Sequence, residues 1–174
     1  MDRSTGIPAP PATAGRGGRI TGTTGPMLLD DTQVAIDELL AACQESATHY
    51  ADAAGRVGTP ALAGLFDGIA AERRDDVECL AGIVRDSGRL PRAPYADRRD
   101  LHQFVTHAKA ALADDEARVL LDDRIADERR LGELADGVLR QAPDAATRDC
   151  VERIGRRAGE ARARLTDAIG GNDG

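Results

Sequence analysis

Three acidic residues occupy positions from which they could act together inside a helical protein. Glu72 and Asp76 belong to a series of positions spaced three or four apart, namely 62, 65, 69, 72, 76, 80 and 83. Glu128 falls on a similar series later in the chain. Carboxylate oxygens are ligands for hard divalent cations, and helical bundles use them to hold iron or manganese. We therefore predict that these three residues face one interior site, with a metal ion as the first chemistry to test.

Three further residues could extend such a site. Glu45 and His49 are four positions apart, which places them on the same face of a helix, although off its main apolar stripe. Glu160 lies beside the deep positions of the last expected helix. We add Glu45, His49 and Glu160 to the metal-ligand candidates. For Glu45 and His49, the alternative is an ordinary contact on a solvated helix face.

The interior acids also have an alternative interpretation. Arg73, Arg124 or Arg129 could pair with them, or the acids could point into solvent. Bundles that hold two metal ions take two of their ligand pairs from Glu-x-x-His sequences, and none occurs in this chain. The chain also has no phosphate-binding glycine loop and no nucleophile elbow. We therefore assign no catalytic residue and no cofactor-binding residue, and expect no cofactor, with iron or manganese as the alternative.

The composition indicates that helices must position these side chains. Of 174 residues, 41% are hydrophobic, but 31 are alanine and only 2% are aromatic. Alanine, leucine, arginine and glutamate favour helix, whereas the aromatic residues that favour strands are nearly absent. The net charge of −7 argues against nucleic-acid binding. No apolar run reaches the roughly 18–20 residues of a membrane span.

Apolar periodicity predicts four long helices. The first starts at Asp30 or Asp31 and ends near Gly55, and Thr59-Pro60 begins a second that stops near Ser87-Gly88. Asp114 begins the third, Pro143 ends it, and the fourth runs to Gly170. Between the second and third helices, Pro91 and Pro94 predict a crossover, followed by a short amphipathic helix over 101–112. The predicted fold is an all-α four-helix bundle with one long crossover, the arrangement of ferritin-like proteins.

The remaining segments bear on partners and compartment. Residues 1–26 are rich in Gly, Pro and Thr and predict a disordered tail before a bundle domain at 27–170. The cysteines Cys43, Cys79 and Cys150 are odd in number and widely spaced, so we expect reduced, small core residues.

We expect a cytoplasmic bacterial protein. Alanine-rich seams suggest a homo-oligomer, dimeric or higher, and the tail is a candidate docking segment for a protein partner.

Residues 34–168 share four stretches with a known family. The stretches run from Leu39 to Ala54, Leu62 to Arg73, Leu101 to Ala117 and Arg162 to Leu165. As a set, they resemble an uncharacterised bacterial family, a domain of unknown function classed with the ferritin-like folds. The resemblance implies the fold but no reaction.

The chain departs from that family at two places. An acid-rich run in the third helix reads Asp123-Arg124-Ile125-Ala126-Asp127 here, and a late His-Asp pair is Gly159-Glu160. These departures imply an incomplete metal site. We therefore expect a non-enzymatic bundle that acts by association, as a scaffold or stress-related protein. The alternative is a metal-binding protein or oxidase with a degenerate site.

Overall fold

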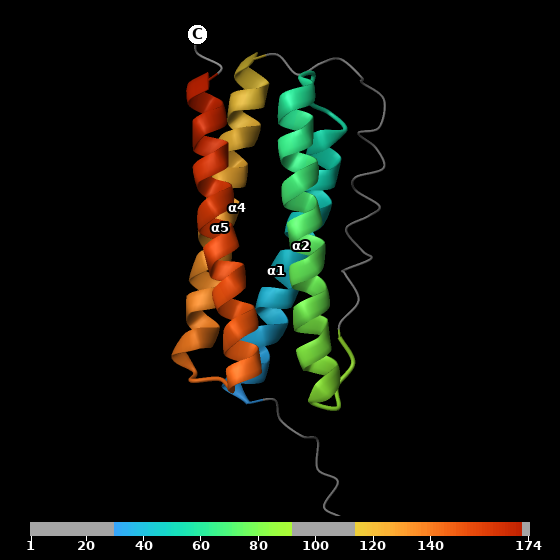
Figure 1. Ribbon diagram of the computed structural model, residues 1–174, viewed down its shortest axis with the longest axis vertical. Helices are drawn as coiled ribbons and strands as arrows, with labels where there is room; N and C mark the ends of the chain where they lie inside the picture. The colour runs from blue at the N-terminus through green and yellow to red at the C-terminus, as the bar shows by residue number, and fades with distance from the viewer. Residues whose placement is uncertain (1–29, 92–113, 172–174) are drawn as a thin grey trace, which may run out of the picture.

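The computed structural model describes residues 30–91 and 114–171. It contains four long helices, α1 (Asp31–Ala54), α2 (Pro60–Asp86), α4 (Asp114–Arg140) and α5 (Ala145–Gly171). No strand occurs within the described residues. The predicted all-α four-helix bundle is confirmed (Figure 1).

The helices form two antiparallel hairpins, α1 with α2 and α4 with α5 (Figure 1). Between the hairpins, α1 packs against α4 and α2 packs against α5. Helix α2 ends and α4 begins at opposite ends of the bundle, so these two helices run in the same direction (Figure 1). This is the order that a long crossover between α2 and α4 requires. The short helix predicted over 101–112 and the predicted tail at 1–26 lie outside the described residues.

The ends of the helices follow from local chemistry. Asp30 caps α1, because its carboxylate accepts a 2.7 Å hydrogen bond from the backbone N–H of Gln33, whose side chain accepts one from the N–H of Asp30. Pro60 occupies the first turn of α2, where its missing N–H costs nothing. Beyond α2, Gly88 adopts φ 75°, a conformation that favours glycine. The predicted boundaries therefore hold.

The core consists of two apolar clusters at different levels of the bundle. The larger one contains Leu39, Cys43, Leu80, Leu131 and Ile154, among others. The smaller one contains Tyr50, Phe66, Ile69, Leu121 and Leu165, among others. Along α1, α2 and α4, buried polar residues lie between the positions that contribute to the two clusters. They form a polar level of the bundle and are Ser46 on α1, Arg73 and Asp76 on α2, and Glu128 on α4.

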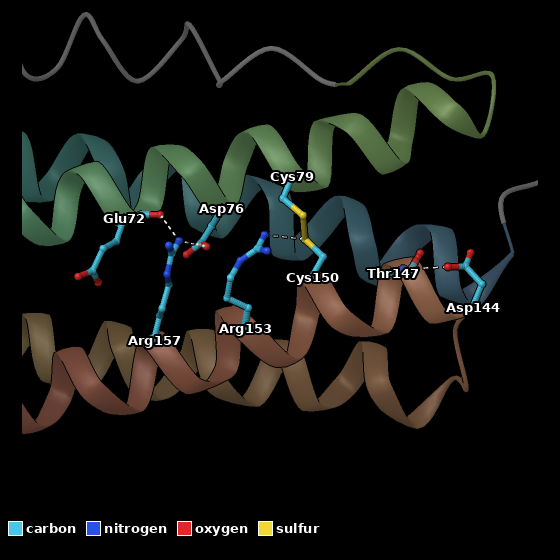
Figure 2. The surroundings of a disulfide bond; sticks show 8 residues. All are labelled: Glu72, Asp76, Cys79, Asp144, Thr147, Cys150, Arg153 and Arg157. Carbon is cyan, nitrogen blue, oxygen red and sulfur yellow. Dashed lines mark hydrogen bonds and ion pairs between the residues drawn. A yellow bond between two sulfur atoms is a disulfide. The ribbon is translucent and has the colours of Figure 1, made fainter.

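One expectation about the cysteines is wrong. Cys79 on α2 and Cys150 on α5 form a disulfide, with their Cα atoms 6.5 Å apart (Figure 2). Only Cys43 is a free core cysteine as predicted, and burial raises the pKa of its thiol to about 12. The bonded residues are 71 positions apart, and spacing alone cannot show that packing α2 on α5 brings them together.

Within the described ranges, no helix combines the length and the apolar character that a membrane span requires.

Candidate functional site

A fully buried arginine lies at the centre of the polar level. Arg73 on α2 donates 2.7 Å hydrogen bonds to Asp76, one turn along the same helix, and to Glu128 on α4. The side chains of Arg73 and Asp76 are 0% exposed, and Glu128 is 1% exposed. A guanidinium presents several N–H donors in a fixed plane, so one arginine can satisfy two carboxylates at once. The ion pairs therefore tie α2 to α4 through the bundle interior.

Helix α5 supplies the second partner of Asp76. Arg157 donates a 2.7 Å hydrogen bond to the other carboxylate oxygen of Asp76 and a 3.1 Å bond to the backbone carbonyl of Glu72 (Figure 2). Its guanidinium also lies 3.7 Å from the exposed carboxylate of Asp75. Asp76 thus accepts one arginine from α2 and another from α5. Three of the four helices meet at this polar level through ion pairs.

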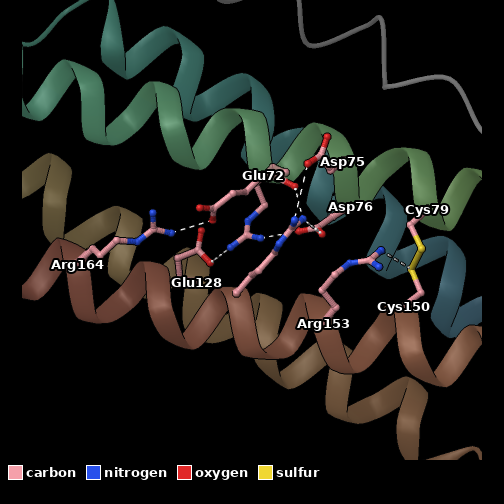
Figure 3. Close-up of polar contacts among 10 residues, drawn as sticks. Glu72, Asp75, Asp76, Cys79, Glu128, Cys150, Arg153 and Arg164 are labelled. Carbon is pink, nitrogen blue, oxygen red and sulfur yellow. Dashed lines mark hydrogen bonds and ion pairs between the residues drawn. A yellow bond between two sulfur atoms is a disulfide. The ribbon is translucent and has the colours of Figure 1, made fainter.

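The third acid lies at the edge of the cluster. Glu72 is 29% exposed and accepts a 2.8 Å hydrogen bond from Arg164 of α5 (Figure 3). Each predicted interior acid therefore has at least one arginine partner. We call Glu72, Asp76, Glu128, Arg73, Arg157 and Arg164 the central ion-pair cluster. At full ionisation its three carboxylates and three guanidiniums cancel.

Burial and pairing oppose each other in this cluster. Burial disfavours the charge on Arg73, but Glu128 and Asp76 outweigh that effect and hold the pKa of Arg73 above its usual value. Burial also raises the pKa of Glu128 above that of a free glutamate, although Arg73 acts to lower it. The arginine is therefore a permanent cation, whereas the carboxylate of Glu128 bears a desolvation penalty.

Glu128 also lies beside the hydroxyl of Tyr50 on α1. Neither its Oε1 nor that hydroxyl makes a hydrogen bond of standard geometry among the described residues, but a side-chain interaction between them acts to raise the pKa of Tyr50 and to lower that of Glu128. They are near enough that the charge of Glu128, after burial, helps to raise the pKa of Tyr50. The ring of Tyr50 packs against Phe66 at 5.7 Å between centroids, and the guanidinium carbon of Arg124 lies 6.0 Å from its centroid. Tyr50 thus borders the cluster and joins it to the smaller apolar cluster.

The other metal-ligand candidates lie outside the buried cluster. Glu45 and His49 approach to 4.0 Å and are 42% and 29% exposed, and His49 also lies 3.7 Å from Asp127. The contact with His49 is the main reason that the pKa of Asp127 is lowered. Glu160 is 59% exposed and faces Arg156 at 3.8 Å. Asp76 and Glu128 therefore share Arg73 in the interior, Glu72 pairs with Arg164 at the edge of the cluster, and Glu160 remains on the outer face of α5.

The apolar periodicity does not indicate Arg157 and Arg164 as members of the cluster, and it leaves Arg73 as only one of several alternative partners for the acids. The inner stripe of α2 passes through positions 66, 69, 73, 76 and 80, so Arg73, and not Glu72, takes the deep position. That series has the same three-and-four spacing as the predicted one. The signal was present, but a basic residue on an apolar stripe was not expected to be buried.

The residues of the cluster do not fit a di-metal centre. A shared ion would need the carboxylates of Asp76 and Glu128 to turn away from Arg73, which would leave a guanidinium buried beside a divalent cation. Uncompensated buried charges are strongly unfavourable. Within the described ranges, no group of three or more His, Cys, Asp or Glu side chains is arranged to hold a metal ion.

The fold is that of a ferritin-like four-helix bundle. A solved structure, that of the bacterioferritin-related protein from Bacteroides fragilis described as a dodecameric thioferritin, has the same fold with a TM-score of 0.60. The two are 20% identical, and the match covers 79% of this chain and 84% of that one. Residues 31–141 match the family described as Domain of unknown function (DUF2383), and the chain belongs to that family. No curated protein matches the sequence.

Proposed function

We propose that this protein is a non-enzymatic ferritin-like bundle that acts by association with further copies of itself or with another protein. The observation that carries the proposal is the position of Arg73, whose guanidinium bridges Asp76 and Glu128 at 2.7 Å each. An arginine in this position pairs with the interior carboxylates, so that they stabilise the bundle and are not available to bind a metal ion. The function then belongs to the outer surface of the helices.

Self-association is the first form of association to test. The structurally similar protein of Bacteroides fragilis is described as dodecameric, which supports the proposal without identifying an interface. Val119 on α4 is 61% exposed, the largest exposure of a bulky apolar side chain within the described helices. An apolar side chain in solvent is a candidate contact with a second copy, although a single one is also common on monomers.

Light scattering after size-exclusion chromatography tests this form of the proposal. We expect a mass of two or more chains, with Val119→Glu shifting the protein toward the monomer. Arg162→Glu, an exposed position on α5, is the matched control and should leave the mass unchanged. A monomeric wild-type protein that also captures no partner in a pull-down would contradict association as the function.

A second candidate function is divalent-metal binding, with iron or manganese as the cation. It is favoured by the burial of Asp76 and Glu128 around one guanidinium, with Glu72 at the edge of the same cluster. It requires Arg73 to move away from both of its carboxylates. Stoichiometric metal that is lost when the acids are replaced would support this function over the first.

A further inference from the structure

The disulfide lies in a setting that distinguishes its two sulfur atoms. Cys150 is 2% exposed, whereas Cys79 is partly exposed. The guanidinium of Arg153, one turn along α5, donates a 3.7 Å hydrogen bond to the sulfur of Cys150 (Figure 2). Among the described residues, no cationic side chain donates a hydrogen bond to the sulfur of Cys79. The bond is therefore asymmetric in both access and charge.

These differences matter for thiol–disulfide exchange. A thiolate attacks one sulfur of a disulfide, and the other sulfur leaves with the electron pair. A neighbouring cation stabilises a thiolate and makes it a better leaving group. Access favours attack at Cys79. Burial disfavours a thiolate at Cys150, and the guanidinium of Arg153 opposes that cost and so favours the departure of Cys150. Both effects select the same direction of cleavage.

We propose that the Cys79–Cys150 disulfide is a reversible exchange site for a dithiol reductant, attacked at Cys79, with Cys150 as the leaving thiolate that Arg153 stabilises. In the first step the reductant forms a mixed disulfide with Cys79, and the thiolate of Cys150 takes up a proton. In the second step the other thiol of the reductant closes an internal disulfide and releases Cys79, which is also protonated. Two electrons and two protons pass from the dithiol to the protein.

Cys43 does not serve as an internal attacking thiol. It belongs to the same apolar cluster as Cys150 but is 0% exposed. Burial raises the pKa of its thiol to about 12, so it is protonated at neutral pH. The attacking thiolate must therefore come from another molecule. This inference does not depend on the proposed association.

The consequence of exchange concerns the contact between the hairpins. Along α2, Cys79 follows Asp76 by one turn, and along α5, Arg157 follows Arg153 by one turn. The disulfide and the Asp76–Arg157 ion pair are thus neighbouring ties between α2 and α5 (Figure 2). Reduction removes the covalent tie and leaves the ion pair.

The first test maps the attacked sulfur in the folded wild-type protein. Reduced glutathione is added to the oxidised protein, free thiols are alkylated after short times, and peptides are analysed by mass spectrometry. We expect glutathione on Cys79 and the alkyl group on Cys150, with the reverse product at least about tenfold rarer. Glutathione mainly on Cys150 would overturn the proposal, and so would a wild-type protein purified without reductant that contains three free thiols.

The second test measures the rate of reduction by dithiothreitol. We expect Arg153→Gln to slow the reaction by at least about threefold and Arg153→Lys to restore most of the rate, because lysine keeps the positive charge. Arg156→Gln, on the exposed side of the same helix, is the matched control and should react at the wild-type rate. An unchanged rate in Arg153→Gln, or a disulfide that resists reduction until the protein is unfolded, would overturn the proposal.

Discussion

The guanidinium of Arg73 lies 2.7 Å from the carboxylate of Glu128, across the interior between α2 and α4, and both side chains are almost completely buried. Together with the 2.7 Å contact between Arg73 and Asp76, this pair fixes the centre of the bundle. Elements from the two hairpins are joined there by charge instead of by apolar packing. This arrangement leads to predictions about the stability, the pH dependence and the metal content of the protein.

Removal of the central arginine should be costly. Arg73→Met leaves Asp76 and Glu128 buried with fewer opposing charges, and breaking a buried pair in this way costs about 3–5 kcal/mol of unfolding free energy. Urea denaturation followed by circular dichroism measures the loss. Arg74→Met, at the exposed neighbouring position, should change stability by less than about 0.5 kcal/mol. Equal losses in the two variants would mean that the buried position has no special role.

The pH dependence of stability should reveal the desolvation of Glu128. Burial raises the pKa of Glu128 in the folded protein above the unfolded value of 4.5. Folded protein therefore holds the proton more tightly, and the contribution of Glu128 to stability decreases as pH rises from 4.5 through the raised pKa. Urea denaturation of wild type and Glu128→Gln across this range should show that the unfolding free energy of the wild type decreases, relative to that of the variant, as pH rises. A wild-type advantage that grows with pH would contradict the sign.

The disulfide should contribute measurably to stability. It closes a loop of 71 residues, which corresponds to about 4 kcal/mol in the chain-entropy description. Excess dithiothreitol should therefore lower the urea midpoint of the wild type but not that of Cys79→Ser. Cys43→Ala is the matched control and should keep the sensitivity to reductant. A wild-type midpoint that is the same in oxidising and reducing buffer would rule out this contribution.

Two glycines should respond to alanine with opposite signs. Gly68 lies within α2, where an added Cβ meets none of the described residues within 4 Å, so Gly68→Ala should stabilise by roughly 0.5–1 kcal/mol. Gly88 has φ +75°, which strains alanine, so Gly88→Ala should destabilise by roughly 1 kcal/mol. Thermal unfolding of the two variants checks both signs. A destabilised Gly68→Ala would indicate that something other than the described residues covers this face of α2.

Much of the fold could be predicted because its signals are local. Asp30 and Pro60 mark helix starts through side-chain and backbone chemistry within a few residues, and the apolar spacing gives the interior faces. The inward positions of Asp76 and Glu128 also followed from periodicity. These inferences need no knowledge of which helix contacts which.

The rest depends on contacts across the bundle. A shift of one position decides whether Glu72 or Arg73 takes the deep place on α2, since neighbouring helical residues point about 100° apart. The partners of Asp76 and Glu72 on α5, and the disulfide between Cys79 and Cys150, depend on packing between segments 71 or more residues apart. Spacing within one helix carries no information about such pairs.

The most direct test of the account is the metal content of untagged protein from cells grown with added iron and manganese, measured by mass spectrometry beside Glu72→Ala/Glu128→Ala. Because Arg73 neutralises the interior carboxylates, we predict far less than one ion per chain in the wild type, with no change in the double variant. One or two ions per chain in the wild type, lost in the double variant, would contradict the account and establish the cluster as a metal site.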